Sequence, residues 1–315
     1  MQRGKWSWRR LLSGFLATAP FAVPGPPAAR EEVLHLFDYD AGAPLDVRVE
    51  ATMREPETGL TLHTLSYASP KGGRVPATLI VPDGPGPFAG ILSQHGLPGR
   101  RQEQVPEAEE LARRGAVVLM IDAPFSRPDR PYIGDPGDPV HFTAGDREDQ
   151  IQLIVGLRRG VDLLLARPDV DGARLGYLGV SYGGAMGGLL AGVERRLRAF
   201  ALVVGDGGLI SHFTADGGGS LRRLPAAQAE RWLAAMGPIE PLHWVGRAVP
   251  AELLFQNGRR DRLVPPASAR AYQAAGSEPK TILWYDADHA LGPRARRDRH
   301  DWLARRLGLR AAPPL

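Results

Sequence analysis

Residues 175–188 read LGYLGVSYGGAMGG, and Ser181 near their centre stands in a Gly-x-Ser-x-Gly pattern. Apolar residues typical of a strand precede this serine, and small residues compatible with a helix follow it. A strand, a sharp turn and a helix in this order form a nucleophile elbow, in which a strained backbone lifts the serine hydroxyl above the sheet. Strand and helix almost touch there, so Gly179 and Gly183 are predicted to have no room for a side chain. In a chain with 38 glycines the Gly-x-Ser-x-Gly pattern also fits an ordinary strand-to-helix turn. Other residues of the chain are therefore needed to distinguish a nucleophile elbow from such a turn.

Strand-like and helix-like stretches alternate on both sides of this turn. Apolar strands are predicted at 88–94, 116–121, 175–178, 199–204, 251–255 and 281–285, and helices at 103–114, 149–166, 184–196, 266–275 and 294–307. Before them, alternating stretches predict antiparallel strands at 47–53, 60–67 and 75–81, with a hairpin turn at Gly72 and Gly73. The fold class is therefore α/β, with a mostly parallel central sheet, antiparallel strands at its N-terminal side and helices on both faces.

Two long stretches interrupt the alternation. Residues 122–146 are dense in Pro, Gly and Asp, and loops of that length often carry function, so this one is expected to wall a substrate site. Residues 205–249 contain a helix-like stretch and the tryptophans Trp232 and Trp244. We interpret 205–249 as a small lid-like insertion over the active site, and 30–315 as a single domain.

Ser181, Asp261 and His289 each follow a predicted strand, in that order along the chain. Side chains at the carboxyl ends of parallel strands meet at one edge of the sheet. A serine hydroxyl needs a base to take its proton, a neutral imidazole can do this, and a carboxylate can hold the imidazole in the required tautomer. The order nucleophile, acid, base is that of α/β-hydrolases. Asp206 also follows a predicted strand and is the alternative acid.

Four motifs carry a resemblance to known proteins, namely GVSYGG at 179–184, NGRRDRLVP at 257–265, DADHAL at 286–291 and HGLPG at 95–99. Together they resemble α/β-hydrolases of the dienelactone hydrolase and acetyl esterase branch. This resemblance implies a serine esterase that cleaves carboxylic esters through an acyl-enzyme intermediate, with a Ser-Asp-His triad and no cofactor. It also places the two backbone N–H donors of an oxyanion hole at Tyr182 and Leu97.

Other functions fit the same motifs. The tyrosine after the serine also resembles serine peptidases of the prolyl-oligopeptidase type, and lactonases and acyltransferases use the same fold. A binding protein that keeps the fold without catalysis is the alternative from a different class.

The composition of the chain limits the metals, cofactors and binding partners that can be expected. The chain has no cysteine, which excludes disulfides and thiolate metal sites, and it has neither a His-x-x-x-His pair nor a dinucleotide fingerprint. We therefore predict no metal and no cofactor. The 39 basic residues are interspersed with 35 acidic ones, so the net charge of +4 does not predict nucleic-acid binding. The expected partner is a small-molecule ester, and the oligomeric state is not indicated.

Residues 1–29 have the pattern of an export signal. Basic residues come first, an apolar stretch at 11–23 follows, and small and proline residues end it. The basic part loosely resembles a twin-arginine signal. We expect a secreted or periplasmic protein with no stable membrane anchor after signal removal, and the alternative is a cytoplasmic enzyme with a basic N-terminus.

Overall fold

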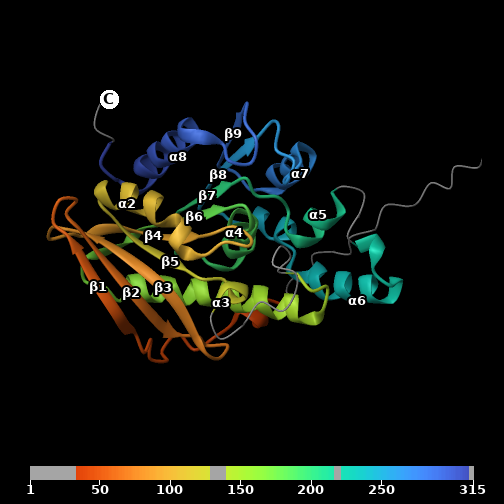
Figure 1. Cartoon of the computed structure of the whole chain (residues 1–315), viewed down its shortest axis with the longest axis horizontal. Coiled ribbons are helices and arrows are strands. Elements are labelled where there is room, and N and C mark those ends of the chain that lie inside the picture. The colour runs from red at the N-terminus through yellow and green to blue at the C-terminus, as the bar shows by residue number, and fades with distance from the viewer. Residues whose placement is uncertain (1–32, 128–139, 216–220, 312–315) are drawn as a thin grey trace, which may run out of the picture.

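The computed structural model describes residues 33–127, 140–215 and 221–311. Within these ranges nine strands form one sheet in the order β1-β2-β3-β5-β4-β6-β7-β8-β9 (Figure 1). The strands are β1 (Arg48–Glu55), β2 (Leu60–Ala68), β3 (Arg74–Pro82), β4 (Phe88–Gln94), β5 (Ala116–Ile121), β6 (Val170–Val180), β7 (Ala199–Val203), β8 (Glu252–Gly258) and β9 (Lys280–Tyr285). The strands β1, β2 and β3 pair antiparallel, β3 also pairs antiparallel with β5, and all later pairs are parallel. The predicted α/β class with antiparallel N-terminal strands is confirmed.

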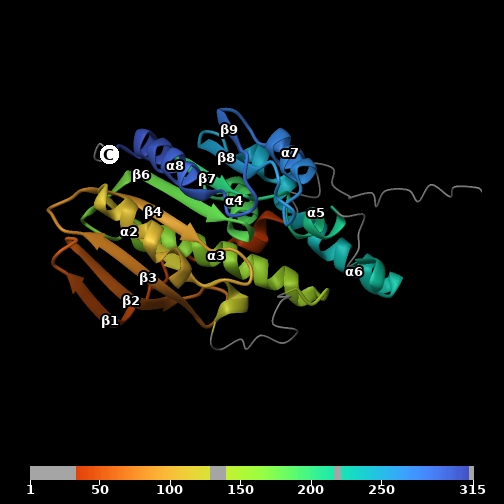
Figure 2. The same cartoon turned by 45° about the horizontal axis from the view of Figure 1, so that its top comes forward.

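Helices cover both faces of the sheet, as the sequence predicts. The helices α2 (Val105–Arg113) and α8 (Gly292–Leu307) pack on one face, and α3 (Ala144–Leu165), α4 (Tyr182–Val193) and α7 (Pro266–Ala275) pack on the other (Figure 2). Each face has its own apolar core, with Leu111 and Leu303 on the α2 side and Leu157 and Leu189 on the α3 side. None of the helices in the described ranges combines the length and apolarity needed to cross a membrane.

Burial along the strands explains their composition. Every residue of β5 is buried, because helices cover both faces at the middle of the sheet, and its sequence is continuously apolar. At the sheet edge β1 is exposed along nearly its whole length, and Val49 remains 57% exposed. The hairpin between β2 and β3 turns at Gly72 and Gly73, whose φ angles of 94° and 71° favour glycine.

Helix α3 begins at Ala144, five residues before the predicted start at 149. Thr143 caps it, since its hydroxyl accepts the Gly145 N–H, and Asp146 bonds back to the Thr143 N–H at 3.2 Å. Trp232 adds a hydrogen bond of 2.7 Å from its indole N–H to Asp146. The sequence Thr-x-x-Asp is a recognisable capping signal. This signal lies within the stretch 122–146 that we interpreted as a loop, of which residues 128–139 fall outside the described residues.

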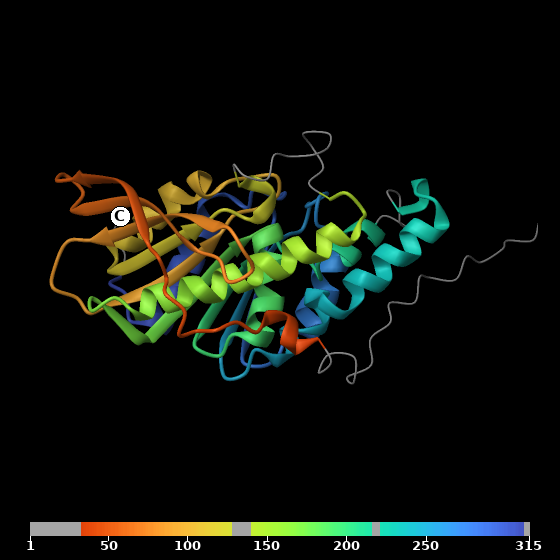
Figure 3. The ribbon, with the colours of Figure 1, turned by 90° about the horizontal axis from the view of Figure 1, so that it is seen from below.

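The described residues of the stretch 205–249, which exclude 216–220, form two α-helices and several single 3-10 turns. Helix α5 (Leu209–Thr214) follows β7, and α6 (Ala226–Met236) lies at the end of the molecule remote from the β1–β2 hairpin (Figures 1 and 3). Trp232 and Trp244 are almost fully buried, so both belong to the core. The interpretation of this stretch as a lid-like insertion stays a prediction.

Candidate active site

Ser181 lies at the sharp turn between β6 and α4. Its backbone has φ 55° and ψ −115°, a conformation that costs energy for any residue with a side chain. The Ser181 N–H donates to the Val203 carbonyl at 2.8 Å, which fixes the turn against the neighbouring strand β7. A side-chain carbon at Gly179 would collide with the carbonyl of Gly183, and one at Gly183 would collide with the carbonyl of Gln94. The close approach expected of a nucleophile elbow is therefore present here.

The loops after β8 and β9 bring Asp261 and His289 to this serine. The His289 Nε2 lies 3.0 Å from the Ser181 Oγ, and its Nδ1 lies 2.7 Å from the Asp261 Oδ2. An ionised Asp261 carboxylate can accept a hydrogen bond but cannot donate one, so the His289 Nδ1 has to carry the proton that it donates to Asp261. In a neutral imidazole the lone pair of Nε2 then faces the Ser181 hydroxyl. This arrangement lets the imidazole take the serine proton.

The surroundings of Asp261 keep it ionised. Burial by itself raises the pKa of this carboxyl, but the hydrogen bond to His289 and two backbone N–H bonds outweigh burial and lower the pKa below its usual value. Those two bonds, from Leu263 and Val264 to the Oδ1, are both 2.9 Å long. With the side chain fully buried, each carboxylate oxygen thus has a defined partner.

The alternative acid, Asp206, pairs with a different histidine. Its Oδ2 lies 3.1 Å from the Nδ1 of His212 on α5, and its Oδ1 accepts the Gly208 N–H at 3.2 Å. The structure therefore brings Asp261 to His289 and Asp206 to His212. The sequence analysis did not identify His212. The sequence indicates this pair only by a histidine that stands six residues after an aspartate at a strand end. Helix α5 gives no further signal, because it is too short to show a helical periodicity.

The two residues expected to supply oxyanion N–H groups lie beside the serine. Leu97 and Tyr182 line the same cavity as Ser181. Tyr182 is the first residue of α4, so its N–H has no acceptor within the helix.

The His95 side chain is buried beneath the loop that follows β4 and contains Leu97. Its Nδ1 bonds the Gly96 carbonyl at 2.7 Å and its Nε2 accepts the Ala123 N–H at 3.1 Å. Burial lowers the pKa of His95, so the ring stays neutral and can accept at Nε2. His95 therefore ties the loop after β4 to the end of β5.

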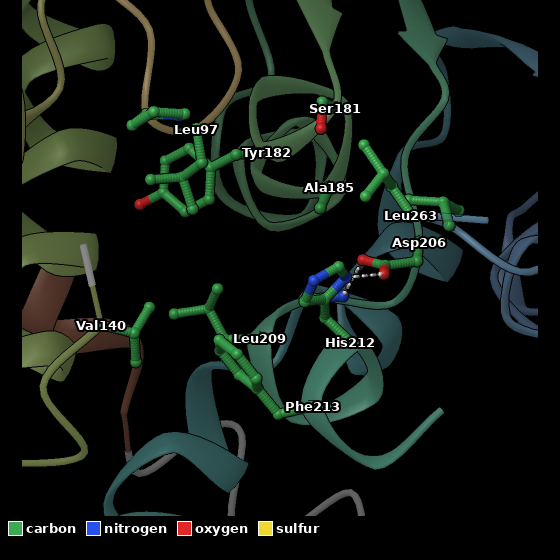
Figure 4. A pocket seen from close by; sticks show the side chains of 13 residues that line it. Leu97, Val140, Ser181, Tyr182, Ala185, Asp206, Leu209, His212, Phe213 and Leu263 are labelled. Carbon is green, nitrogen blue, oxygen red and sulfur yellow. Dashed lines mark hydrogen bonds and ion pairs between the residues drawn. The ribbon is translucent and has the colours of Figure 1, made fainter. Parts of the chain in front are cut away.

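A cavity of about 300 Å³ opens at Ser181 (Figure 4). Its wall is mostly apolar, and its lining residues are Leu97, Pro98, Val140, Ser181, Tyr182, Ala185, Asp206, Gly208, Leu209, His212, Phe213, Leu263 and Val264. Figure 4 shows the Asp206–His212 pair at one side of this cavity and Leu97 with Tyr182 at another. Tyr182 lines the cavity, and Phe125 packs edge-on against Tyr182 and His95.

A second, more open hollow borders His289. It is lined by Arg260, Arg262, Leu263, Asp288, His289 and Ala290, and Leu263 also lines the cavity at Ser181. Leu263 therefore borders both spaces, while Ser181 lines the first and His289 lines the second. Among the described residues, no group of three or more histidine or acidic side chains is arranged to hold a metal ion.

No family model matches the chain. A curated relative, acyl-coenzyme A thioesterase 1 of Mus musculus, is 28% identical over 183 residues, which are 54% of this chain and 39% of that protein. The chain thus spans about two fifths of the length of that relative.

Solved structures match over most of the chain. Acetyl xylan esterase 1 from Thermoanaerobacterium sp. JW/SL YS485 aligns with a TM-score of 0.71 and 18% identity, over 89% of this chain and 93% of that one. An acetyl xylan esterase from Paenibacillus sp. R4 aligns with a TM-score of 0.68 and 20% identity, over 88% and 93% of the two chains. At these identities the likeness establishes the fold, and it confirms at that level the resemblance drawn from the motifs.

Proposed function

We propose that this chain, which has the α/β-hydrolase fold, is a serine hydrolase that cleaves carboxylic esters through an acyl-enzyme intermediate. The observation that carries the proposal is the continuous chain of contacts from Asp261 through His289 to Ser181, with lengths of 2.7 and 3.0 Å. The strained turn at Ser181 also favours catalysis, because backbone strain of this kind persists where a function needs it.

In the proposed reaction the Ser181 Oγ attacks the ester carbonyl carbon while the His289 Nε2 takes the hydroxyl proton. The oxygen of the tetrahedral intermediate accepts hydrogen bonds from the Tyr182 and Leu97 N–H groups. The intermediate then expels the alcohol, which leaves with the proton from His289, and the acyl group stays on the serine. Water repeats the same steps, so the acid is released and the serine is restored. Asp261 stabilises the imidazolium formed in each half.

The two spaces at the site give the substrate a direction. The alcohol leaves with a proton from His289, so it belongs on the side where His289 borders the open hollow. The acyl group then extends into the cavity that begins at Ser181 and Tyr182. Because the cavity is mostly apolar and about 300 Å³ in volume, an acyl chain of short to medium length fits it.

The test is hydrolysis of p-nitrophenyl acetate, butyrate and octanoate by the protein lacking residues 1–29, beside its Ser181→Ala variant. Turnover that disappears in the variant supports the esterase, and the chain-length profile measures the acyl cavity. If Ser181 reacts with a fluorophosphonate probe but no ester is cleaved, a peptidase or a narrow natural ester becomes the better hypothesis. If the protein cleaves no ester and the probe does not label Ser181, the serine-hydrolase proposal is excluded.

Thioesters are a second substrate class to test. The curated relative is described as an acyl-coenzyme A thioesterase, and the hollow beside His289 contains two arginines, Arg260 and Arg262, that could face an anionic leaving group. Replacing Arg262 with Ala should then raise the KM for butyryl-coenzyme A and leave the KM for p-nitrophenyl butyrate unchanged.

Export remains part of the proposal. Residues 1–29 lie outside the described residues, and the expected secreted or periplasmic location rests on their sequence pattern alone. Fusion of 1–29 to a reporter enzyme that is active only after export would test it.

A further inference from the structure

The cavity at Ser181 borders a smaller cavity beyond Tyr182. Four residues line both spaces, namely Leu97, Val140, Tyr182 and Leu209. The smaller cavity measures about 10 Å³, which is room for about one water molecule or one group of that size. It is also lined by Gln150, on the second turn of α3, so a mostly apolar cavity leads to a polar side chain.

No donor in the described part of the chain reaches the carbonyl oxygen of Gln150. The side chain is 1% exposed, and its amide nitrogen donates to the Asp146 carbonyl at 3.4 Å and lies 3.5 Å from the sulfur of Met236. The Asp146 carbonyl fixes which end of the amide is the nitrogen, because two carbonyl oxygens cannot bond each other. The Oε1 is then a buried acceptor, and such an atom is unfavourable unless a water or a ligand donates to it.

The Tyr182 side chain lines the same small cavity. Figure 4 shows its hydroxyl at the end of the ring remote from Ser181. Burial, together with the charge of Asp146, raises the pKa of Tyr182, so the phenol stays protonated and can donate a hydrogen bond. Within the described ranges no residue bonds this hydroxyl. A donor on Tyr182 and an acceptor on Gln150 therefore border a space that holds about one polar group.

From these contacts we infer that the substrate is an ester of an ω-hydroxy acid, whose apolar chain lies along the cavity and whose terminal hydroxyl binds between Gln150 and Tyr182. The inference rests on the proposed ester hydrolysis, which places the acyl group in this cavity. A hydroxyl can donate to the Gln150 Oε1 and accept from the Tyr182 O–H at the same time. A chain that ends in a methyl group would instead leave both polar groups unpaired in a closed space, which is unfavourable.

The charges at the small cavity favour a hydroxyl over a charged end group. Asp146 and Asp149 line this cavity, and none of its described lining residues is a lysine or arginine, so a terminal carboxylate would be repelled. A terminal ammonium has donors only and cannot accept a hydrogen bond from the Tyr182 hydroxyl. The carboxylate of Asp146 is also already engaged, because it accepts two backbone N–H groups and the indole N–H of Trp232.

The test compares the methyl esters of ω-hydroxyhexanoic, ω-hydroxyoctanoic and ω-hydroxydecanoic acid with methyl hexanoate, octanoate and decanoate. Acid release is followed by titration at constant pH. We expect that at one chain length or more the hydroxyl raises kcat/KM about tenfold, the size of one hydrogen bond in a buried site. This ratio should fall to about one in Gln150→Leu and by about threefold in Tyr182→Phe. Because both esters of a pair are measured on the same variant, a change in folding or catalysis that affects both cancels in the ratio.

Gln152→Leu is the matched control. Gln152 lies on the same helix, is 8% exposed and also has an Oε1 without a donor among the described residues. It lines neither of the two cavities, and its amide nitrogen donates instead to the Gly72 carbonyl at 3.3 Å. Gln152→Leu should therefore keep the wild-type ratio, and a loss as large as that of Gln150→Leu would contradict a specific role of Gln150.

Three other results would overturn the inference. The first is a ratio of one or less in the wild type at every chain length, and the second is a tenfold preference that survives in Gln150→Leu. The third is a larger gain with the ω-amino esters than with the ω-hydroxy esters, which would assign the selection to the two aspartates.

If no ester is hydrolysed, the proposed function fails, and the inference is then decided by binding. In the Ser181→Ala variant, NMR titration should show tighter binding of methyl ω-hydroxyoctanoate than of methyl octanoate. The difference should vanish when Gln150→Leu is added. Equal binding of the two esters to Ser181→Ala would reject the recognition by Gln150 independently of any catalysis.

Discussion

Replacing Asp261 with Asn tests the proposed triad most sharply, because the structure determines which way the new amide must turn. The Oδ1 of Asp261 accepts two backbone N–H groups, from Leu263 and Val264, each at 2.9 Å. An amide NH₂ placed there would oppose two donors, so the Asn oxygen keeps this position. The amide NH₂ then faces the Nδ1 of His289, where the carboxylate oxygen was.

The consequence for His289 is a change of tautomer. Its Nδ1 has to accept a hydrogen bond from the amide, so the ring proton moves to Nε2, which faces Ser181. An imidazole in that form cannot take the serine proton. Substitutions of this kind in serine triads lower kcat by roughly 10⁴-fold, and we expect about 10³- to 10⁴-fold here, equal to about 4–5 kcal/mol in the transition state.

The assay is kcat on p-nitrophenyl butyrate, with thermal unfolding to verify that the variant folds. Asp286→Asn is the matched control, since Asp286 is a highly exposed carboxylate three residues before His289, and its kcat should stay within about twofold. Asp206→Asn should lower kcat far less than Asp261→Asn. The reasoning is refuted if Asp261→Asn keeps more than a tenth of the activity, or if Asp206→Asn causes the larger loss.

Three further predictions concern stability, each measured by urea denaturation. Glu107→Ala should lower the free energy of unfolding by roughly 3–5 kcal/mol, because it leaves the buried Arg299 and His300 of α8 without the carboxylate that pairs with both. Gly183→Ala should cost roughly 2–3 kcal/mol, since the new carbon meets the Gln94 carbonyl at the elbow. Burial raises the pKa of Glu240 to about 8 from 4.5, so between these values the folded protein keeps a proton that the unfolded chain has lost. The free energy of unfolding should therefore fall as pH rises from 5 to 8, by up to roughly 3–5 kcal/mol from this group, and Glu240→Gln should remove that part of the decline.

Each of these predictions has a contrary result. Glu109→Ala breaks an exposed pair with Arg113 and should cost no more than about 1 kcal/mol, so a loss as large as that of Glu107→Ala would contradict the buried network. A fully stable Gly183→Ala protein would show that the elbow can open without cost. An unchanged pH slope in Glu240→Gln would mean that Glu240 is ionised in the folded protein.

The sheet and the elbow were predictable because both depend on short-range patterns. Continuous apolar runs such as that of β5 predict strands covered on both faces, and the alternation of strands with helices predicts their parallel pairing. The spacing of Gly179, Ser181 and Gly183 follows from the close approach of strand and helix, which leaves no room for a side chain. The early start of α3 was missed, although the Thr143 cap is visible in the sequence, because the surrounding composition is typical of a loop.

The sequence by itself determined the fold class and reduced the candidate triad to Ser181, His289 and one of two acids, because side chains that could form such a triad follow strand ends in a fixed order. Only the tertiary structure separated the acids. Asp206 follows β7 and Asp261 follows β8, and both strands lie between β6 and β9 in the sheet. The path of each loop beyond the strand end then decides which carboxylate meets which imidazole, and that path depends on contacts between residues far apart in the chain. The same contacts, which no local pattern records, place His212 beside Asp206 at the wall of the cavity.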